Sequence, residues 1–326
     1  MRRKVLAALA LASVWAGVAG QTPVRTPVAR PYRSRVTVYD LKSKSTRVIY
    51  SSDDVFEAPN WSPDGKYVLV NSKGRLFRIL LDTTAQGALQ QLNVPDEYSC
   101  NNDKAFSPDG KMLAFSALTP SSEGSRVFLA ASDGSSPRLI VPRAPSFFHG
   151  WSPDGRWLAY VAMRNGPYAL YRVPAAGGEE ERLTSKGSYD DGPDYAPQGR
   201  WIYFNSNRSG GWDIWRIPPD GAGPNDNRAE QVTNDELEDW FPHISPNGKW
   251  MVFLSFPKGI AGHSDRMEGV KLRLMRAPGS RLKPAQIQVL TTFFGGQGTI
   301  NVNSWSPSSE RFAFVSYEPI AGPPKP

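Results

Sequence analysis

Histidines and carboxylates gather in a few segments of the 326-residue chain. The three histidines, each in a polar segment between apolar runs, are His149, His243 and His263. Two acidic clusters occupy similar segments, one with Asp190, Asp191 and Asp194 and the other with Glu236, Glu238 and Asp239. Imidazole and carboxylate groups are the usual ligands of divalent cations, and histidine titrates near neutral pH. The three histidines are therefore candidate metal ligands, with a divalent cation as the candidate cofactor.

The alternative is a hydrated funnel in which polar residues gather only because loops are polar. No short-spaced ligand motif occurs, and histidines scattered through loops are a poor sign of a metal site. This interpretation predicts a protein without a cofactor, and no residue receives a catalytic role. We expect binding rather than catalysis.

Aromatic and charged residues outside the repeated positions favour such a binding function. Aromatic anchors ringed by charges suit a bound peptide or a sugar stacked on a ring. Single aromatics can equally cap the ends of a folded unit, so the aromatic residues alone do not decide the ligand. The candidate binding residues are Lys104, His149, Asp190, Asp191, Asp194, Arg208, Asp239, Trp240, His243, Lys258, His263 and Gln297.

These residues are interleaved with a repeated phrase of turn type. Ser-Pro-Asp-Gly occurs at Ser62, Ser107 and Ser152, and variants follow as APQG, SPNG and SPSS, giving spacings of 45, 45, 44, 49 and 61 residues. An aromatic or large apolar residue precedes each turn, and a β-rich run such as KYVLV or RWLAY follows it. The proline and glycine serve the turn, and the aromatics are expected to be core residues. The repeat therefore defines the scaffold.

A period near 45 residues with four strand-like segments per copy predicts a β-propeller with six blades. The sixth copy has only two strands of its own, while the N-terminal runs 35–40 and 46–50 resemble a third and a fourth strand. We therefore expect an all-β propeller over 35–317 that is closed by its N-terminal strands, which removes open sheet edges. A proline-rich tail at 21–34 precedes it, and another at 318–326 follows.

The turns and the candidate site should lie on opposite faces of the propeller. Rigid blades position irregular segments around a central funnel, so we expect function in the loops of the face opposite the turns. A long segment between two strands of the fifth repeat, 256–269, is expected to cover the mouth of this funnel.

The leader and the charge distribution predict export. Residues 1–20 combine a basic start, an apolar run and small residues, as in a cleaved signal peptide. The formal net charge is +7, but six basic residues lie in 1–34, leaving about +1 for the body, so nucleic acid is not an expected partner. The single cysteine, Cys100, cannot form an internal disulfide. We expect a periplasmic or secreted monomer without a transmembrane segment in the mature chain.

The turn repeats, with RLTSKGSYDDGPDYAPQGRWIYFNSNRSGGWDIWRI as the fullest copy, closely resemble those of the TolB family, periplasmic components of the Tol–Pal envelope system. The resemblance covers nearly all of 35–317 and implies binding of an envelope protein or peptide. The α/β domain that precedes the TolB propeller is replaced here by a short tail. Similar repeats in oligogalacturonate lyases, which hold manganese with histidines and a glutamine, imply the alternative of a carbohydrate-active propeller. That match fails residue by residue, and no Gly-x-Ser-x-Gly hydrolase motif occurs.

Overall fold

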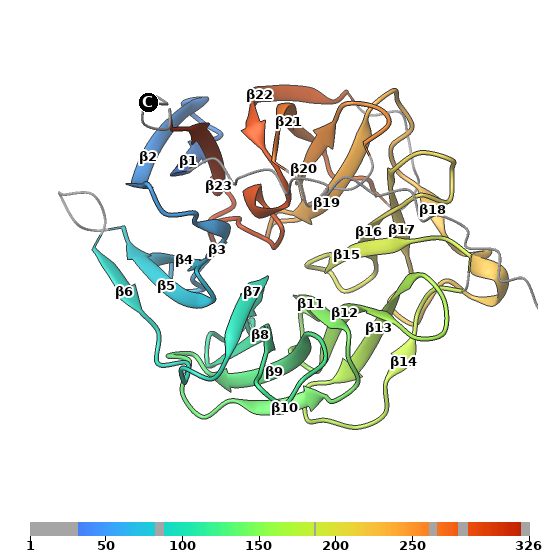
Figure 1. Ribbon diagram of the computed structural model, residues 1–326. Helices are drawn as coiled ribbons and strands as arrows, with labels where there is room; N and C mark the ends of the chain where they lie inside the picture. The colour runs from blue at the N-terminus through green and yellow to red at the C-terminus, as the bar shows by residue number, and fades with distance from the viewer. Residues whose placement is uncertain (1–31, 82–87, 186, 261–265, 280–285, 321–326) are drawn as a thin grey trace, which may run out of the picture. The chain divides into compact units, whose positions relative to one another are not determined.

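The computed structural model describes residues 32–81, 88–185, 187–260, 266–279 and 286–320 as six small antiparallel sheets arranged in a ring (Figure 1). The all-β, six-bladed propeller expected from the repeats is confirmed. Among the described residues the only helical turns are two 3-10 segments, η1 (Pro224–Asp226) and η2 (Gln297–Thr299).

Five blades each contain four consecutive strands, ordered from the inner strand at the axis to the outer strand. Blade 1 contains β3 (Glu57–Trp61), β4 (Tyr67–Ser72), β5 (Arg75–Leu80) and β6 (Leu89–Gln91). Blade 2 contains β7 (Ser99–Phe106), β8 (Met112–Leu118), β9 (Arg126–Ala131) and β10 (Arg138–Val141). Blade 3 contains β11 (Ser146–Trp151), β12 (Trp157–Met163), β13 (Tyr168–Pro174) and β14 (Glu181–Arg182). Blade 4 contains β15 (Asp190–Tyr195), β16 (Ile202–Ser206), β17 (Asp213–Ile217) and β18 (Glu230–Gln231). Blade 5 contains β19 (Glu238–Ile244), β20 (Trp250–Phe256), β21 (Met267–Arg276) and β22 (Gln288–Gly295).

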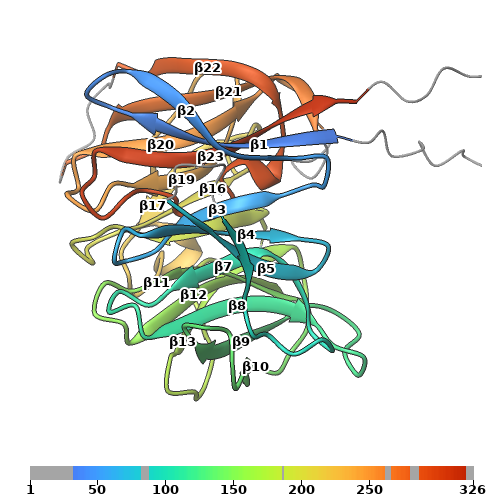
Figure 2. The ribbon, with the colours of Figure 1, turned by 90° about the vertical axis from the view of Figure 1, so that its left-hand side faces the viewer.

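The sixth blade joins the two ends of the described chain. Its sheet has the order β2 (Ser45–Ser52), β1 (Tyr32–Asp40) and β23 (Arg311–Pro319), and an isolated bridge between Trp305 and Phe312 marks its inner edge. β1 runs antiparallel to β23 with Val36 opposite Val315, and Figure 2 shows these strands side by side. The predicted closure by N-terminal strands is therefore confirmed, because β1 and β2 supply the strands that the last repeat lacks.

The hydrophobic core lies between neighbouring blades. Six clusters of buried residues each join two adjacent sheets. Between blades 1 and 2, for example, Leu69 packs with Phe115, whose ring stacks on Phe128 at 5.7 Å between centroids. Each sheet is covered on both sides by its neighbours, which explains the nearly continuous apolar strands of the repeat.

The Ser-Pro-Asp-Gly turns repeat one hydrogen-bonding pattern. The Ser62 hydroxyl donates to Asp64 Oδ1 at 2.7 Å and accepts from the Tyr67 backbone N–H at 3.1 Å. Gly65 has φ 75°, a left-handed conformation that glycine adopts without strain. The turns at Ser107 and Ser152 have the same serine–aspartate bond. All inner strands therefore end in similar turns on one face, here called the turn face, and begin on the opposite face, here called the loop face.

The inner strands of blades 1 to 5 are interrupted by bulges. Register shifts occur at Glu57–Asn60, Cys100–Lys104, Phe148–Gly150, Asp191–Asp194 and Trp240–His243. A bulge re-aims the side chains of a strand, and bulges are common at sheet edges and beside functional sites. Positive φ at Ala58, Gly192 and Phe241 falls at the same distance before the turn. The bulges occur where polar residues line the axis, and they position the residues of the candidate site.

Candidate functional site

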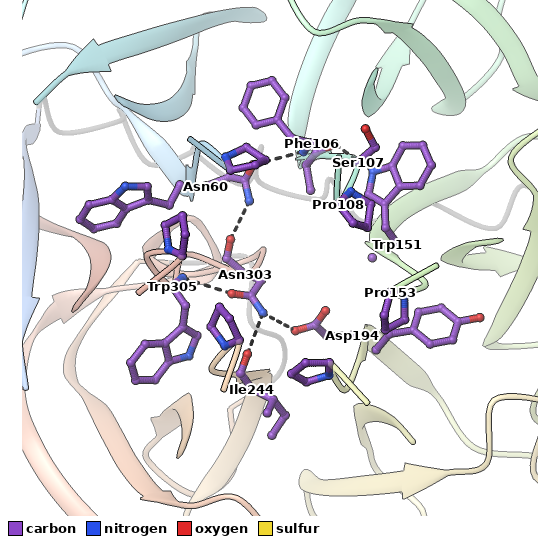
Figure 3. Close-up of a pocket in the computed structure, with 18 of the residues that line it drawn as sticks. Asn60, Phe106, Ser107, Pro108, Trp151, Pro153, Asp194, Ile244, Asn303 and Trp305 are labelled. Atoms are coloured by element: carbon purple, nitrogen blue, oxygen red, sulfur yellow. Dashed lines mark hydrogen bonds between the residues drawn. The ribbon is translucent and has the colours of Figure 1, made fainter. Parts of the chain in front are cut away.

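Two cavities lie along the propeller axis, one toward each face. The turn-face cavity measures about 380 Å³ and is lined by the turn prolines, the aromatic residues before them and a polar floor that includes Asn60, His149, Asp194 and Asn303 (Figure 3). The loop-face cavity measures about 280 Å³ and is lined by Asp103, Phe147, His149, Val161, Tyr168, Tyr189, Asp191 and Gln297. His149 lines both, so one buried imidazole lies between the two spaces.

A histidine between two carboxylates forms the floor of the loop-face cavity. His149 Nε2 lies 3.2 Å from Asp191 Oδ1 and 3.9 Å from Asp103 Oδ1. Asn301 Nδ2 donates to Asp103 Oδ1 at 2.7 Å. All four side chains are buried, with at most 5% exposed. The carboxylates face Nε2, so this nitrogen is the one that carries a proton in the neutral ring.

Burial and neighbouring charges shift the pKa values of Asp103 and His149 in this floor. Burial raises the pKa of Asp103 to about 6, although His149 and Asn301 oppose the shift. Burial lowers the pKa of His149, but the hydrogen bond to Asp191 and the charges of Asp103 and Asp191 outweigh it, and the Asn301 backbone adds to their effect, so the net shift is upward. Asp103 therefore exchanges its proton closer to neutral pH than an exposed carboxyl does.

Aromatic rings form one side of the loop-face cavity. The rings of Phe147 and Tyr168 lie 6.0 Å apart between centroids, and Tyr168 stacks on Tyr189 at 5.2 Å. The three rings are half-buried, whereas the carboxylates below them are buried. Burial, with the nearby Asp191 charge, raises the pKa of both tyrosines, so their hydroxyls remain protonated. The cavity thus combines π faces with an acidic floor.

The floor of the turn-face cavity is a closed hydrogen-bond network. Asp194 Oδ2 accepts from Asn303 Nδ2 at 2.9 Å and lies 3.1 Å from His243 Nδ1. His243 Nε2 lies 2.7 Å from the Ile300 carbonyl oxygen, and Asn60 Nδ2 donates to the Asn303 carbonyl at 2.7 Å. Figure 3 shows Asn303 between Asn60 and Asp194. These contacts connect blades 1, 4, 5 and 6 across the axis.

Lys104 connects blade 2 to blade 1 and is fully buried. Its Nζ donates to the Ala58 carbonyl and to Asn71 Oδ1, both at 2.6 Å. Burial lowers the pKa of Lys104 to about 7, against the opposing charges of Glu57 and Asp103. This residue lines neither cavity, and its contacts are structural.

The remaining predicted site residues have several different environments. Arg208 Nη2 contacts Asp190 Oδ1 at 2.8 Å, and Asp239 accepts from Ser255 Oγ at 2.5 Å and Arg273 Nη1 at 3.2 Å. Burial raises the pKa of Asp239 to about 7, although Ser255 and Arg273 oppose the shift.

Gln297 lines the loop-face cavity, and Lys258 is exposed. His263 and residues 261–265 of the expected cover over the funnel lie outside the described residues.

Two expectations about placement need correction. The acidic clusters were assigned to loops, but Asp190, Asp191 and Asp194 lie on β15 and Glu238 and Asp239 on β19, because the bulged inner strands extend to the loop face. Trp240 was expected as a loop aromatic, but its ring is fully buried and packs on Trp212 at 3.8 Å between centroids. It belongs to the core and presents no surface to a ligand.

Sequence reasoning missed several residues that build the site. Asp103, Asn301 and Tyr168 line or support the loop-face cavity, and Asn60 and Asn303 close the turn-face floor. In the sequence, the residues five to two positions before each turn differ from one repeat to the next. This variation within an otherwise regular repeat could have indicated most of these site residues. The turn-face cavity itself was missed because its prolines and aromatics were assigned wholly to the scaffold.

Within the described residues, no group of three or more His, Cys, Asp or Glu side chains is arranged to hold a metal ion. Cys100 is buried, and burial raises the pKa of its thiol to about 12, which makes it a poor nucleophile. No helix in the described part of the chain is long and apolar enough to span a membrane.

Comparison with known proteins places the chain among bacterial propellers. Residues 141–276 match the model of the PD40 family, the TolB beta propeller domain. An uncharacterized protein of Agrobacterium fabrum is 39% identical over 288 residues, which cover 88% of this chain and 94% of that protein. A solved TolB-like protein of Agrobacterium tumefaciens superposes with a TM-score of 0.81 at 39% identity, over 89% of this chain and 99% of the other.

The similarity to TolB proteins themselves is more limited. The Tol-Pal system protein TolB of Xanthomonas campestris is 40% identical over 60 residues, which cover 18% of this chain and 14% of that protein. The TolB structure from Acinetobacter baumannii superposes with a TM-score of 0.56 at 19% identity, over 75% of this chain and 61% of the other. This second likeness concerns the fold alone.

Proposed function

Because the chain belongs to the TolB-like β-propeller family, we propose that it is a binding module of the bacterial cell envelope that holds a protein or peptide at the loop face of its axis. The observation that carries this proposal is the loop-face cavity. Its half-buried aromatic rings and buried acidic floor offer one pocket in which a side chain of a partner could be anchored.

The size of the cavity favours a protruding group over a large ligand. At about 280 Å³, the cavity is slightly smaller than the roughly 300–1,000 Å³ of typical small-molecule sites. Such a pocket suits one side chain of a larger partner whose remaining contacts lie on the surrounding loops. The proposal therefore concerns a partner protein or peptide, with the cavity as its anchor point.

The leader and the relatives support the cellular setting. The N-terminal sequence has the pattern of a signal peptide, and the relative from Xanthomonas campestris is named for the Tol-Pal system. We propose a periplasmic or secreted mature protein that acts as a monomer. Fractionation by osmotic shock followed by N-terminal sequencing should recover a mature chain that begins near Gln21.

Site-directed photocrosslinking tests the binding function. A photoreactive phenylalanine analogue at Gln297, on the loop-face cavity, should crosslink an envelope protein in intact cells. The same analogue at Lys111, an exposed turn-face residue, provides the matched control. Equal crosslinking at both positions, or none at Gln297, would contradict the proposal. Chelator-sensitive cleavage of an oligosaccharide by the purified protein would instead favour the carbohydrate-active alternative.

A further inference from the structure

The outer strands of the six blades differ in length. β6, β10, β14 and β18 have three, four, two and two residues, whereas β2 and β22 have eight residues each. Propellers usually leave only short edges, because a long row of unpaired backbone N–H and C=O groups can pair with another chain. β22 is the last strand of its sheet, at the rim of the ring (Figure 1), and no described residue forms a backbone hydrogen bond with its outer edge. Within the described part of the chain, blade 5 therefore has a long open edge.

β22 lacks the residues that usually protect such an edge. Its sequence, QVLTTFFG, contains no charged residue and no proline, and Val289 is 48% exposed. β2, the other long outer strand, carries the exposed Arg47. Charged residues and prolines on edge strands oppose pairing with other chains. The difference indicates that β22 presents an edge suited to pairing, whereas the charge on β2 opposes it.

The loop-face half of β22 is packed against blade 6 through its side chains. Phe293 stacks on Phe314 at 5.7 Å between centroids, and Phe294 stacks on Tyr32 at 5.3 Å. A register shift interrupts the pairing with β21 near the turn-face end, but 291–293 pair with three successive residues of β21. An edge that is already fixed in position costs a binding strand less ordering than a mobile edge. The regular part of the edge is therefore its loop-face half.

This half of the edge leads into the loop-face cavity. β22 ends at Gly295, and Gln297 of η2, two residues later, lines that cavity. A Cβ at Gly298 would lie 2.6 Å from Tyr317 Oη and 2.7 Å from Glu57 Oε1, so η2 packs closely on blades 6 and 1. A strand added to β22 would be continuous with the binding surface proposed above.

We propose that the outer edge of β22 binds an extended segment of the partner protein, which adds a further strand to blade 5 through backbone hydrogen bonds. The inference rests on the proposed protein-binding function and specifies the form in which the partner binds. Backbone groups supply the affinity, and the uncharged side chains beside the edge favour a segment rich in β-branched and apolar residues. The chain that continues from this segment occupies the loop face.

Photocrosslinking and hydrogen exchange test the strand pairing. A photoreactive phenylalanine analogue at the exposed Thr292 should capture, in intact cells, the same protein that the analogue at Gln297 captures. The analogue at Thr46, exposed on β2, is the matched control and should not capture it. In the complex with the captured protein, the fast-exchanging amides of 291–295 should slow by about tenfold or more, whereas those of 45–48 should not change. Absence of this protection would overturn the inference.

A matched pair of charge variants gives a second test. Thr292→Asp places a carboxylate on the edge, opposite Lys271, and should reduce crosslinking at Gln297 about fivefold or more without lowering the melting temperature. Thr46→Asp on β2 should leave that crosslinking unchanged. Unaltered crosslinking in folded Thr292→Asp would overturn the inference, and if this variant does not fold, hydrogen exchange in the wild-type complex decides.

The crosslinks also separate this inference from the proposed function. Capture at Gln297 but not at Thr292 would reject strand pairing and leave the protein-binding function intact. Capture at Thr292 alone, with exchange protection, would reject the loop-face site and leave strand pairing. Capture of a second copy of this chain at Thr292 would show self-association through β22 and overturn the inference. Absence of capture at both positions would reject both proposals.

Discussion

The two ends of the propeller axis are built from the same repeat but serve different purposes. At the turn face, every blade contributes a similar proline and a large apolar residue, and the few polar groups below them bond mainly to one another. At the loop face, the strand segments before the turns carry different side chains in different blades, and Phe147, His149 and Asp191 from two of these segments line one cavity. The comparison teaches that repetition marks the scaffold, whereas departures from it at bulged positions mark the site.

The largest loss of stability is expected from replacing Lys104, the buried residue that connects blade 2 to blade 1. Lys104→Ala removes the donor to the Ala58 carbonyl and to Asn71 and leaves both acceptors buried, so we expect a loss of about 3 kcal/mol in the free energy of unfolding. Urea denaturation at pH 8 provides the measurement. Lys111→Ala, which removes an exposed ammonium group, should change stability by less than about 0.5 kcal/mol. Similar values for the two variants would show that Lys104 is not structural.

A smaller loss is expected from the turn-face floor. Asp194→Ala removes the acceptor at His243 Nδ1 and one of the two acceptors of Asn303 Nδ2, which should cost about 2 kcal/mol in urea denaturation. Crosslinking at Gln297 on the loop face should remain within twofold of wild type. If that crosslinking is lost as well, the two cavities behave as one site, and the contrast between the faces is wrong.

Acidification should change the charge of the loop face. Between pH 8 and pH 5, Asp103, with a pKa of about 6, gains a proton and loses its charge. Lys104, with a pKa of about 7, becomes charged over the same range, while Tyr168 and Tyr189 stay neutral. A carbon-13 NMR titration of the aspartate side chains should therefore show one carboxyl with a midpoint near pH 6, above the ordinary value of about 4, and Asp103→Asn should remove that signal. A midpoint near pH 4 for Asp103 would show that its burial does not shift its titration.

The smallest effect is expected at the repeated prolines. Pro153→Ala leaves the turn hydrogen bonds of Ser152 intact and only relaxes the unfolded chain, so stability should fall by about 0.4–1 kcal/mol. Crosslinking at Gln297 should be unaffected. A large loss of crosslinking would assign a binding role to the turn face and reverse the comparison.

Much of the fold could be predicted from the sequence because the turns need proline and glycine at fixed positions. Ser62 and Gly65 have the hydrogen bonds and φ value that their turn requires, and the same residues recur in each copy. The closing role of 35–40 could be inferred because the last repeat lacked two strands.

The site could be predicted only in part. His149, Asp191 and Gln297 were identified from their types and meet in one cavity. Trp240 could not be distinguished from an exposed ring, since its burial depends on Trp212, which precedes β17, and on Phe256 of β20. Asp103 and Asn301 lie almost two hundred positions apart, and only ring closure brings them into contact.

The pairing of β1 with β23 also determines the order in which the blades can be completed during folding. Val36 cannot meet Val315 until the chain is available through β23, so the sixth blade is the last of the six that a growing or emerging chain can complete. Until then, β1 and the first inner strands lack their neighbours, and contacts of such long range form slowly. An incomplete chain would therefore remain open and accessible to proteases and chaperones. A ring that closes only at β23 suits the export proposed above, because it delays stable folding until all six blades have been translocated.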